Sequence, residues 1–168
     1  MTIRRILIWP DDRLRDVADP VTKWDNELEV FVQDLFDTMY DDEGIGLAAI
    51  QVGVRKRVIV LDCGLESPTP IAMVNPVIEQ TKGETTFAEG CLSIPGIRAE
   101  VDRHEEVTVR YQDVRGASHV LTAAGLLSIC IQHEIDHLNG KLYFDHLPEF
   151  ERKAFLQAYA AIDQESRS

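Results

Sequence analysis

Apolar side chains recur every three or four positions between residues 25 and 42. This spacing places them along one face of a helix. Asp25 or Asn26 supplies the polar side chain that begins such a helix, and Gly44 is suited to end it. We therefore predict an amphipathic N-terminal helix that runs to about Asp42. Its core-facing residues are Leu28, Phe31, Val32, Leu35, Phe36 and Met39.

A second pattern, alternation of apolar and polar residues, predicts strands. It is clearest in residues 105–112, where Val107, Val109 and Tyr111 alternate with polar positions. Pro76 interrupts another such stretch, so we predict an edge position or a bulge there. Residues 113–116 predict a hairpin turn, and residues 89–95 an irregular segment that ends in proline. The predicted strands are 3–9 (a strand or an extended segment), 57–62, 71–80, 105–112 and 118–121.

Residues 124–138 are apolar around nearly the whole circumference of a helix. A helix of this kind is buried, so we predict a central buried helix capped by Thr122 and ended by Asn139 and Gly140. Pro148 fits the first turn of a C-terminal helix that reaches about Ile162. These elements predict an α+β fold with antiparallel or mixed β-sheets packed around the central helix, plus the N-terminal and C-terminal helices. The length of 168 residues suits a single domain, 1–168.

Composition and charge narrow the functional classes. The chain has 29 acidic and 17 basic residues and a net charge of −12, which disfavours non-specific binding to nucleic acid but leaves room for docking through a local basic patch. No apolar run reaches the roughly 18 residues that a membrane span needs, and the N-terminal stretch is too short for a signal peptide. Three cysteines without an export signal indicate a reducing cytosol. We therefore expect a cytoplasmic protein with neither DNA nor membrane as a partner.

The predicted central helix contains the residues with the strongest chemical signal. His133 and His137 are four positions apart and so lie on the same helix face, where two imidazoles can share one divalent ion. Glu134 lies between them and can act as a base on a metal-bound water. A hydrogen-bonded core network without metal is the alternative. Two ligands do not complete a tetrahedral site, so the pattern requires a third from elsewhere. Asp136 is expected to face away from the metal and accept a hydrogen bond from a ligand or a backbone group.

Cys91 is the first candidate for the third ligand. It follows Gly90 in a segment that can present a thiolate and backbone N–H groups, although a lone cysteine is more often a small buried apolar residue. Cys130 is the rival, because it lies on the helix three residues before His133. A row of three ligands on one helix does not readily surround an ion, so we expect Cys130 to line a pocket beside the metal. Cys63 follows a strand, and we expect no role for it.

Residues 44–51 form a third segment of interest. Two glycines flank Ile45 there and allow a close approach of the backbone, although a helix end with small packing residues explains them equally well. Gln51 has a neutral amide that can donate a hydrogen bond to a developing negative charge without competing for a metal.

Taken in order, three segments resemble the signature of the peptide deformylases. They are residues 44–51 (GIGLAAIQ), 89–93 (EGCLS) and 132–138 (QHEIDHL). The similarity extends from Pro10 to Leu147, and the last helix is similar to that of the bacterial enzymes with a helical C-terminus. Trp9 departs from the pattern, since His often precedes this proline, but it lies outside the three motifs. The resemblance implies removal of the formyl group from the N-terminal formylmethionine of new polypeptides, with release of formate.

The resemblance also implies the cofactor. Cys91, His133 and His137 would hold one ion per chain, with water as the fourth ligand. Fe²⁺ is the expected native metal, and Zn²⁺, Ni²⁺ or Co²⁺ can replace it. The anionic thiolate is consistent with this choice, because it suits Fe²⁺ or Zn²⁺ better than Mg²⁺ or Ca²⁺.

The implied catalytic residues are Glu134, Gln51 and Leu92. In the implied reaction the metal-bound water attacks the formyl carbon, while Glu134 takes the water proton and passes it to the leaving amine. The Gln51 side-chain amide and the Leu92 backbone N–H would stabilise the oxyanion together with the metal.

Substrate binding is implied less directly. Backbone groups of Ile45, Gly46 and Gly90 would run along the peptide in the manner of an added strand. Arg98 would contact the peptide further along, or form a plain surface salt bridge. We expect a monomer that acts on N-formylmethionyl nascent peptides, with the ribosome near the exit tunnel as a further partner. The residues that would line the methionine pocket are Leu92, Ile129, Cys130 and His133.

Two other functions remain possible for the histidine pair. In a zinc endoprotease the third ligand is usually a carboxylate or histidine downstream, where the chain has Asp145, His146 and Glu149. The EGCLS segment argues against that reading. The other is a structural metal site in a binding protein, which would be closed by four protein ligands.

Overall fold

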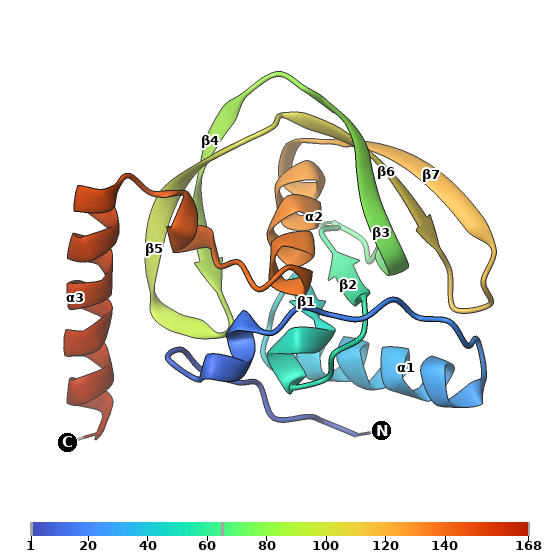
Figure 1. Ribbon diagram of the computed structural model, residues 1–168, viewed down its shortest axis with the longest axis horizontal. Helices are drawn as coiled ribbons and strands as arrows, with labels where there is room; N and C mark the ends of the chain where they lie inside the picture. The colour runs from blue at the N-terminus through green and yellow to red at the C-terminus, as the bar shows by residue number, and fades with distance from the viewer. Residues whose placement is uncertain (1, 65, 168) are drawn as a thin grey trace.

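The computed structural model describes residues 2–64 and 66–167, with side chains as far as Ile162. This part of the chain forms three α-helices, seven β-strands and three short 3-10 helices (Figure 1). None of the helices within it is long and apolar enough to cross a membrane. The α-helices are α1 (Asn26–Asp41), α2 (Gly125–Leu138) and α3 (Glu149–Arg167). The strands are β1 (Gly46–Ala48), β2 (Val58–Asp62), β3 (Pro70–Lys82), β4 (Thr85–Cys91), β5 (Ile94–Arg103), β6 (Glu106–Gln112) and β7 (Ser118–Ala124). The 3-10 helices are η1 (Asp12–Arg15), η2 (Ala49–Val52) and η3 (Tyr143–His146).

The strands form two sheets. Five of them make an antiparallel sheet in the order β1-β2-β3-β6-β7, and β4 pairs with β5 in a separate antiparallel hairpin. In Figure 1, α2 stands between the two sheets, α1 lies below β1 and β2, and α3 stands at the far side of β5. The central helix therefore has neighbours from both sheets.

β2 shows why the five-stranded sheet needs a helix on each face. All five of its residues are buried. Val58 and Val60 belong to the apolar cluster that contains the core face of α1. Ile59 and Leu61 point the other way, into the cluster that contains Ile131 of α2. Successive side chains of a strand face opposite sides of the sheet, so this alternation puts α1 and α2 on opposite faces.

A third apolar cluster covers the two-stranded sheet. Ile94 of β5 packs there with Phe144 of η3 and Phe155 of α3. Tyr159 of α3 donates a hydrogen bond from its hydroxyl to the carbonyl oxygen of Trp9 at 2.6 Å. The C-terminal helix therefore ties the β4–β5 hairpin to the N-terminal segment.

Several sequence predictions are confirmed. The fold is α+β with antiparallel sheets and helices towards both ends of the chain. The side chain of Asp25 caps α1 by accepting a hydrogen bond from the Leu28 backbone N–H at 3.0 Å. Pro76 lies at an irregularity in the β3–β6 pairing, as a bulge predicts. The strand itself is interior rather than an edge, because β3 lies between β2 and β6.

The predicted helix start at Thr122 is wrong, whereas the first helix ends at Asp41, close to the predicted Asp42. Thr122 lies in β7, and its hydroxyl is 3.0 Å from that of Thr108 on β6. β7 runs directly into α2, and Gly125 makes this junction at a φ of +63°, a backbone conformation that glycine adopts without steric cost. At the end of α1, Glu43 rather than Gly44 takes the left-handed conformation, with a φ of 55°.

The irregular segment predicted at residues 89–95 lies mostly in strands, although the pairing shifts register between Glu89 and Cys91. It is the tip of a hairpin, with Cys91 at the end of β4 paired to Ile94 at the start of β5. Residues 3–9 are extended without being a strand, and they attach through backbone bonds from Leu7 and Trp9. The helix α3 begins one residue after Pro148 and continues past Ile162 to Arg167.

Candidate metal centre

Three side chains with metal-binding atoms meet between the two sheets. Cys91 comes from the end of β4, whereas His133 and His137 lie one turn apart on α2. Their ligand atoms all lie within 4.8 Å of one another. Cys91 Sγ is 3.4 Å from His137 Nε2, and the two imidazole centroids are 5.0 Å apart. One thiolate and two imidazoles form a donor set that suits a zinc or ferrous ion and leaves a coordination position open.

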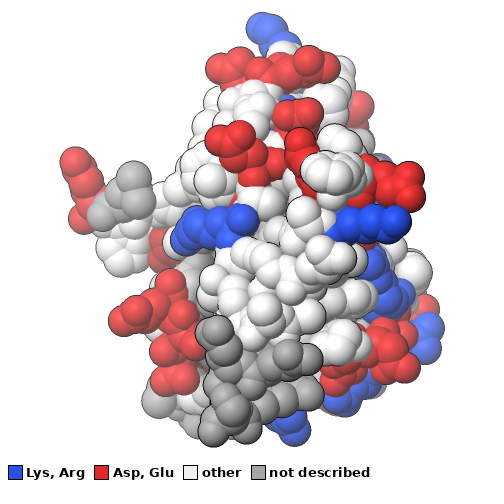
Figure 2. All heavy atoms as spheres, turned by 90° about the vertical axis from the view of Figure 1, so that its left-hand side faces the viewer, with Lys and Arg blue, Asp and Glu red and all other residues white. Residues whose placement is uncertain are grey.

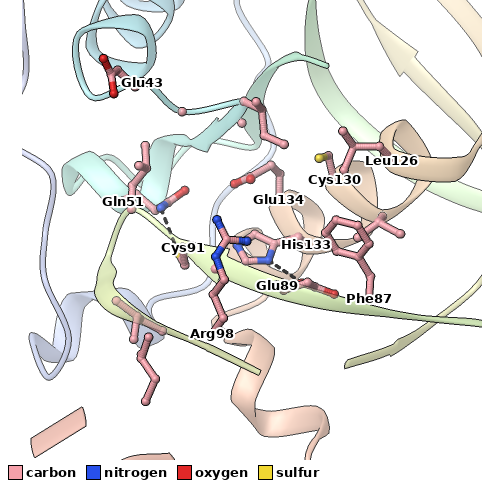
Figure 3. Close-up of a pocket in the computed structure, with 18 of the residues that line it drawn as sticks. Glu43, Gln51, Phe87, Glu89, Cys91, Arg98, Leu126, Cys130, His133 and Glu134 are labelled. Atoms are coloured by element: carbon pink, nitrogen blue, oxygen red, sulfur yellow. Dashed lines mark hydrogen bonds and ion pairs between the residues drawn. The ribbon is translucent and has the colours of Figure 1, made fainter. Parts of the chain in front are cut away.

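Glu89 orients the first histidine. Its Oε1 lies 2.8 Å from His133 Nδ1, in the buried interior of the site (Figure 3). A carboxylate at this distance accepts the Nδ1 proton, which leaves Nε2 with the lone pair that a metal ligand needs. Burial raises the pKa of Glu89, but the hydrogen bonds from Arg103 and His133 outweigh it and hold that pKa below its usual value. Glu89 is therefore an ionised partner for the imidazole.

Arg103 anchors Glu89 in turn. Its Nε and Nη2 donate to the two carboxylate oxygens of Glu89 at 2.7 and 2.9 Å. Its Nη1 donates to Asp136 Oδ2 at 2.7 Å, and the same oxygen lies 2.8 Å from His146 Nε2. Asp136 thus accepts hydrogen bonds, as the sequence predicted, but its partners are Arg103 and His146 rather than a metal-binding residue or a backbone group. This network compensates the buried charges of the site.

His137 is suited to bind a metal as a neutral ring. Burial lowers the pKa of this imidazole well below its usual value, and the nearby charge of His133 lowers it further. Its Nε2 faces Cys91, whereas its Nδ1 has no hydrogen-bond partner among the described protein atoms.

Glu134 is the second buried group without a complete set of partners. Its Oε1 has no hydrogen-bond partner among the described residues. Burial raises the pKa of Glu134 to about 7, which is near the optimum for a group that takes and returns a proton at neutral pH. A Cβ added at Gly46 would lie 2.5 Å from Glu134 Oε2, so the backbone of β1 packs directly on this carboxylate. An unpaired carboxylate oxygen beside two imidazoles and a thiol fits a site built to hold a metal ion and water.

Gln51 presents its amide group to the same place. Its Oε1 accepts a hydrogen bond from the Ala48 N–H at 2.9 Å, which fixes the orientation of the amide. The NH₂ group then points towards Cys91 Sγ at 3.6 Å and Ser93 Oγ at 3.1 Å. Figure 3 shows this group pointing at Cys91. The donor that the sequence predicted at Gln51 is therefore available inside the site.

A cavity of about 650 Å³ opens beside these residues. The structure brings almost every predicted site residue to its wall, and His137 is the exception. Arg98 lies at the wall and donates a hydrogen bond from Nη1 to the Ala88 carbonyl at 3.3 Å. The predicted residues on the wall are Ile45, Gly46, Gln51, Gly90, Cys91, Leu92, Arg98, Ile129, Cys130, His133 and Glu134.

The alternatives for the third ligand lie elsewhere. Among the described residues, the cluster of ligand atoms contains Cys91 and not Cys130, which lines the cavity. His146 is engaged by Asp136, and Asp145 forms an ion pair with Arg15. The downstream carboxylate or histidine of a zinc endoprotease therefore has no counterpart in this cluster.

Other members of the site were not identified from the sequence. Glu89 and Arg103 orient His133, and Ser93 accepts from Gln51. Glu89 begins the EGCLS segment, and this position is the one sequence signal that pointed towards it. The additional residues on the cavity wall are Glu43, Gly44, Phe87, Ile94, Gly96, Ile97 and Leu126.

Comparison with known proteins identifies the family. The sequence model of one protein family, described as polypeptide deformylase, matches residues 3–153 of this chain. The solved structure of a peptide deformylase from Legionella pneumophila is similar at 44% sequence identity and a TM-score of 0.92, covering 99% of this chain and 98% of that chain. A peptide deformylase from Ehrlichia chaffeensis, solved in complex with actinonin, is 35% identical with a TM-score of 0.92 and covers 100% of both chains.

A third solved structure, a peptide deformylase from Synechococcus elongatus in complex with actinonin, is 42% identical with a TM-score of 0.89. It covers 94% of this chain and 88% of that chain. The family match spans most of the chain, and these relatives share its fold over nearly their full lengths. The chain therefore belongs to the polypeptide deformylase family of enzymes, which remove a formyl group.

Proposed function

We propose that this enzyme removes the formyl group from the N-terminal formylmethionine of nascent polypeptides and releases formate. The observation that best supports this proposal is the cluster of Cys91, His133 and His137 beside the unpartnered carboxylate oxygen of Glu134, at the wall of a cavity. We propose that the three ligands hold one divalent ion per chain, with Fe²⁺ as the native metal and Zn²⁺, Ni²⁺ or Co²⁺ as replacements. A bound ion would lower the pKa of its water ligand and polarise the formyl oxygen.

The chain's own residues supply the proton transfers. Glu134 accepts the proton of the attacking water at its carboxylate and later delivers it to the nitrogen of the leaving amine. The Gln51 Nε2 group and the Leu92 backbone N–H donate to the oxygen on which negative charge develops. One such donor typically lowers the activation barrier by about 3–4 kcal/mol. Glu89 acts on this centre through His133, whose ring it orients.

β1 provides the binding surface for the peptide in this proposal. It is at the edge of the five-stranded sheet and lies at the cavity wall through Gly46. An extended peptide can add to such an edge through backbone hydrogen bonds, with Ile45 and Gly46 on one side and Gly90 on the other. Arg98 would contact the peptide further along. The methionine side chain would enter a pocket lined by Leu92, Ile129, Cys130 and His133.

We further propose that residues 1–168 form one catalytic domain, which works as a monomer in the cytoplasm on chains emerging from the ribosome. Figure 2 shows acidic side chains gathered at the upper end of one face, where Figure 1 places the turn between β3 and β4. Contact with the anionic ribosome requires a positive field, so docking would use a surface other than this acidic end.

A formate-release assay on a short formylmethionyl peptide tests this function. We expect turnover with iron under anaerobic conditions, a loss of about 10²-fold or more after removal of the metal by a chelator, and recovery when iron is returned. The acetylated peptide and an internal peptide bond serve as controls and should remain intact. Cleavage of internal bonds alone would contradict the proposed function, and turnover that survives chelation would contradict the proposed metal site.

The close contact between Gly46 and Glu134 leads to a second expected result. In Gly46→Ala the new Cβ would meet Glu134 Oε2 at 2.5 Å, so either the carboxylate or β1 must move. A displacement of about 1 Å at a reacting group can cost about 10²-fold, and we expect kcat/KM to fall by about that factor. Steady-state kinetics on the formyl peptide would measure the change.

Gly125→Ala is the matched control for this glycine substitution. A Cβ at Gly125 would meet no atom within 4 Å, but the φ of +63° is unfavourable for alanine. We expect this control to lose about 1–2 kcal/mol of stability and to keep its activity per folded molecule. Equal losses of activity in the two variants would show that the contact with Glu134 does not matter.

A further inference from the structure

The side-chain amide of Gln51 is held at both ends. Its oxygen accepts a hydrogen bond from the Ala48 N–H at 2.9 Å, and its Nε2 donates to Ser93 Oγ at 3.1 Å. Gln51 and Ser93 are 1% and 0% exposed, so bulk solvent does not replace either bond. Ala48 therefore determines which end of the amide faces the metal centre, and Ser93 determines the direction of the NH₂ group.

The second N–H of Gln51 is left for the metal centre. Nε2 lies 3.6 Å from Cys91 Sγ, as Figure 3 shows. The two N–H groups of a primary amide have fixed directions in one plane, so the one that Ser93 engages sets the direction of the other. Ser93 does not line the cavity, and its hydroxyl therefore acts on the site through Gln51.

The backbones of Ser93 and Gln51 are anchored by the same N-terminal segment. The Ser93 carbonyl oxygen accepts a hydrogen bond from the Trp9 N–H at 2.8 Å, and the Gln51 carbonyl oxygen accepts one from the Leu7 N–H at 2.7 Å. Trp9 is held in turn by the hydroxyl of Tyr159 on α3. A hydroxyl on a backbone fixed in this way can hold the amide in one orientation.

We propose that Ser93 is a positioning residue that directs the Gln51 amide at the oxygen on which negative charge develops. The proposal rests on the proposed deformylase function, in which Gln51 Nε2 is one of the oxyanion donors. Such a donor stabilises the transition state more than the bound substrate, so loss of its direction lowers kcat and leaves KM nearly unchanged. Complete removal of one donor typically costs about 10²–10³-fold, and we expect Ser93→Ala to lower kcat by about 10-fold or more.

Ser128→Ala is the matched control for Ser93→Ala. Ser128 is also 0% exposed, and its Oγ accepts a hydrogen bond from Gln132 Nε2 at the same distance of 3.1 Å. Neither Ser128 nor Gln132 lines the cavity. Both variants lose a buried serine–glutamine hydrogen bond, so we expect both to lose thermal stability. In the formate-release assay only Ser93→Ala should lose kcat, and atomic emission should show an unchanged metal content in both.

A double-mutant cycle separates positioning from packing. Gln51→Ala removes the group on which Ser93 acts, so the addition of Ser93→Ala to it should cost no further activity. Independent losses of kcat in the two variants, or a Ser93→Ala enzyme with wild-type kcat, would overturn the proposal. A wild-type protein that releases no formate would instead overturn the proposed function, so the two proposals can fail separately.

A measurement on the wild type requires no variant to fold. In the isotope-labelled, zinc-loaded protein, one Gln51 side-chain amide proton should show a nuclear Overhauser contact with Ser93 Hβ. The Gln51 amide should also exchange with solvent more slowly than that of Gln33, which is exposed. In Ser93→Ala the proton released from the hydroxyl should move upfield, while the Gln132 signals stay in place. Absence of the contact, or exchange as fast as at Gln33, would contradict the fixed orientation of the amide.

Discussion

Replacing Glu134 with glutamine is expected to lower kcat/KM for a formylmethionyl peptide by about 10²–10⁴-fold, the usual contribution of a general acid–base residue. Glutamine keeps the size of the side chain beneath Gly46, so the packing of β1 on α2 should survive. It cannot accept a proton from water or return one to the amine. The formate-release assay measures the rate, and atomic emission measures the metal that remains bound.

Glu105→Gln is the control, because Glu105 is an exposed carboxylate outside the cavity. It should keep wild-type activity. Full activity of Glu134→Gln with its metal in place would remove Glu134 from the mechanism and favour a purely structural role for the metal site.

Cys91→Ala should remove both the metal and the activity. The structure brings Cys91 from β4 beside the two imidazoles of α2, and two imidazoles alone would leave a metal site incomplete. We expect metal affinity to fall by about 10²-fold or more, since changes to groups that merely support ligands already cost 10–100-fold. Competition with a chelator followed by atomic emission would measure the affinity.

Cys130→Ser tests the rival assignment in the same experiment. Cys130 lines the cavity and is absent from the ligand cluster, so its serine variant should keep its metal. If Cys130→Ser lost the metal while Cys91→Ala retained it, the ligand assignment would be reversed.

The parts of the fold that could be predicted are those with a local signature. α1 has a periodic apolar face and the capping residue Asp25, and both are visible within the helix itself. β5 was missed because its exposed residues alternate irregularly and because Pro95 suggested a break. Thr122 seemed a good helix cap, but its pairing with β6 keeps it in a strand. Pairing between strands is a long-range property, and local preferences do not determine it.

The candidate site divides in the same way. The spacing of His133 and His137 follows from helix geometry and could be predicted. Glu89 and Arg103 could not, because an acidic residue beside a glycine and an arginine in a strand look like ordinary surface positions. Their pairing becomes visible when the β4–β5 hairpin packs on α2 and buries both charges. Leu126 and Phe87 likewise resemble core residues until the cavity beside them is seen.

The three ligands reach the cluster from two layers of the molecule, β4 on one side and α2 on the other. A bound ion would therefore act as a cross-link that closes a loop between distant parts of the chain, much as a disulfide does. High-affinity capture of the ion must wait until the hairpin has docked on the helix, because neither layer holds the full ligand set alone. Loading of a metal would thus be a late event in folding, and a cell short of the metal would accumulate folded molecules that lack this cross-link and are less stable.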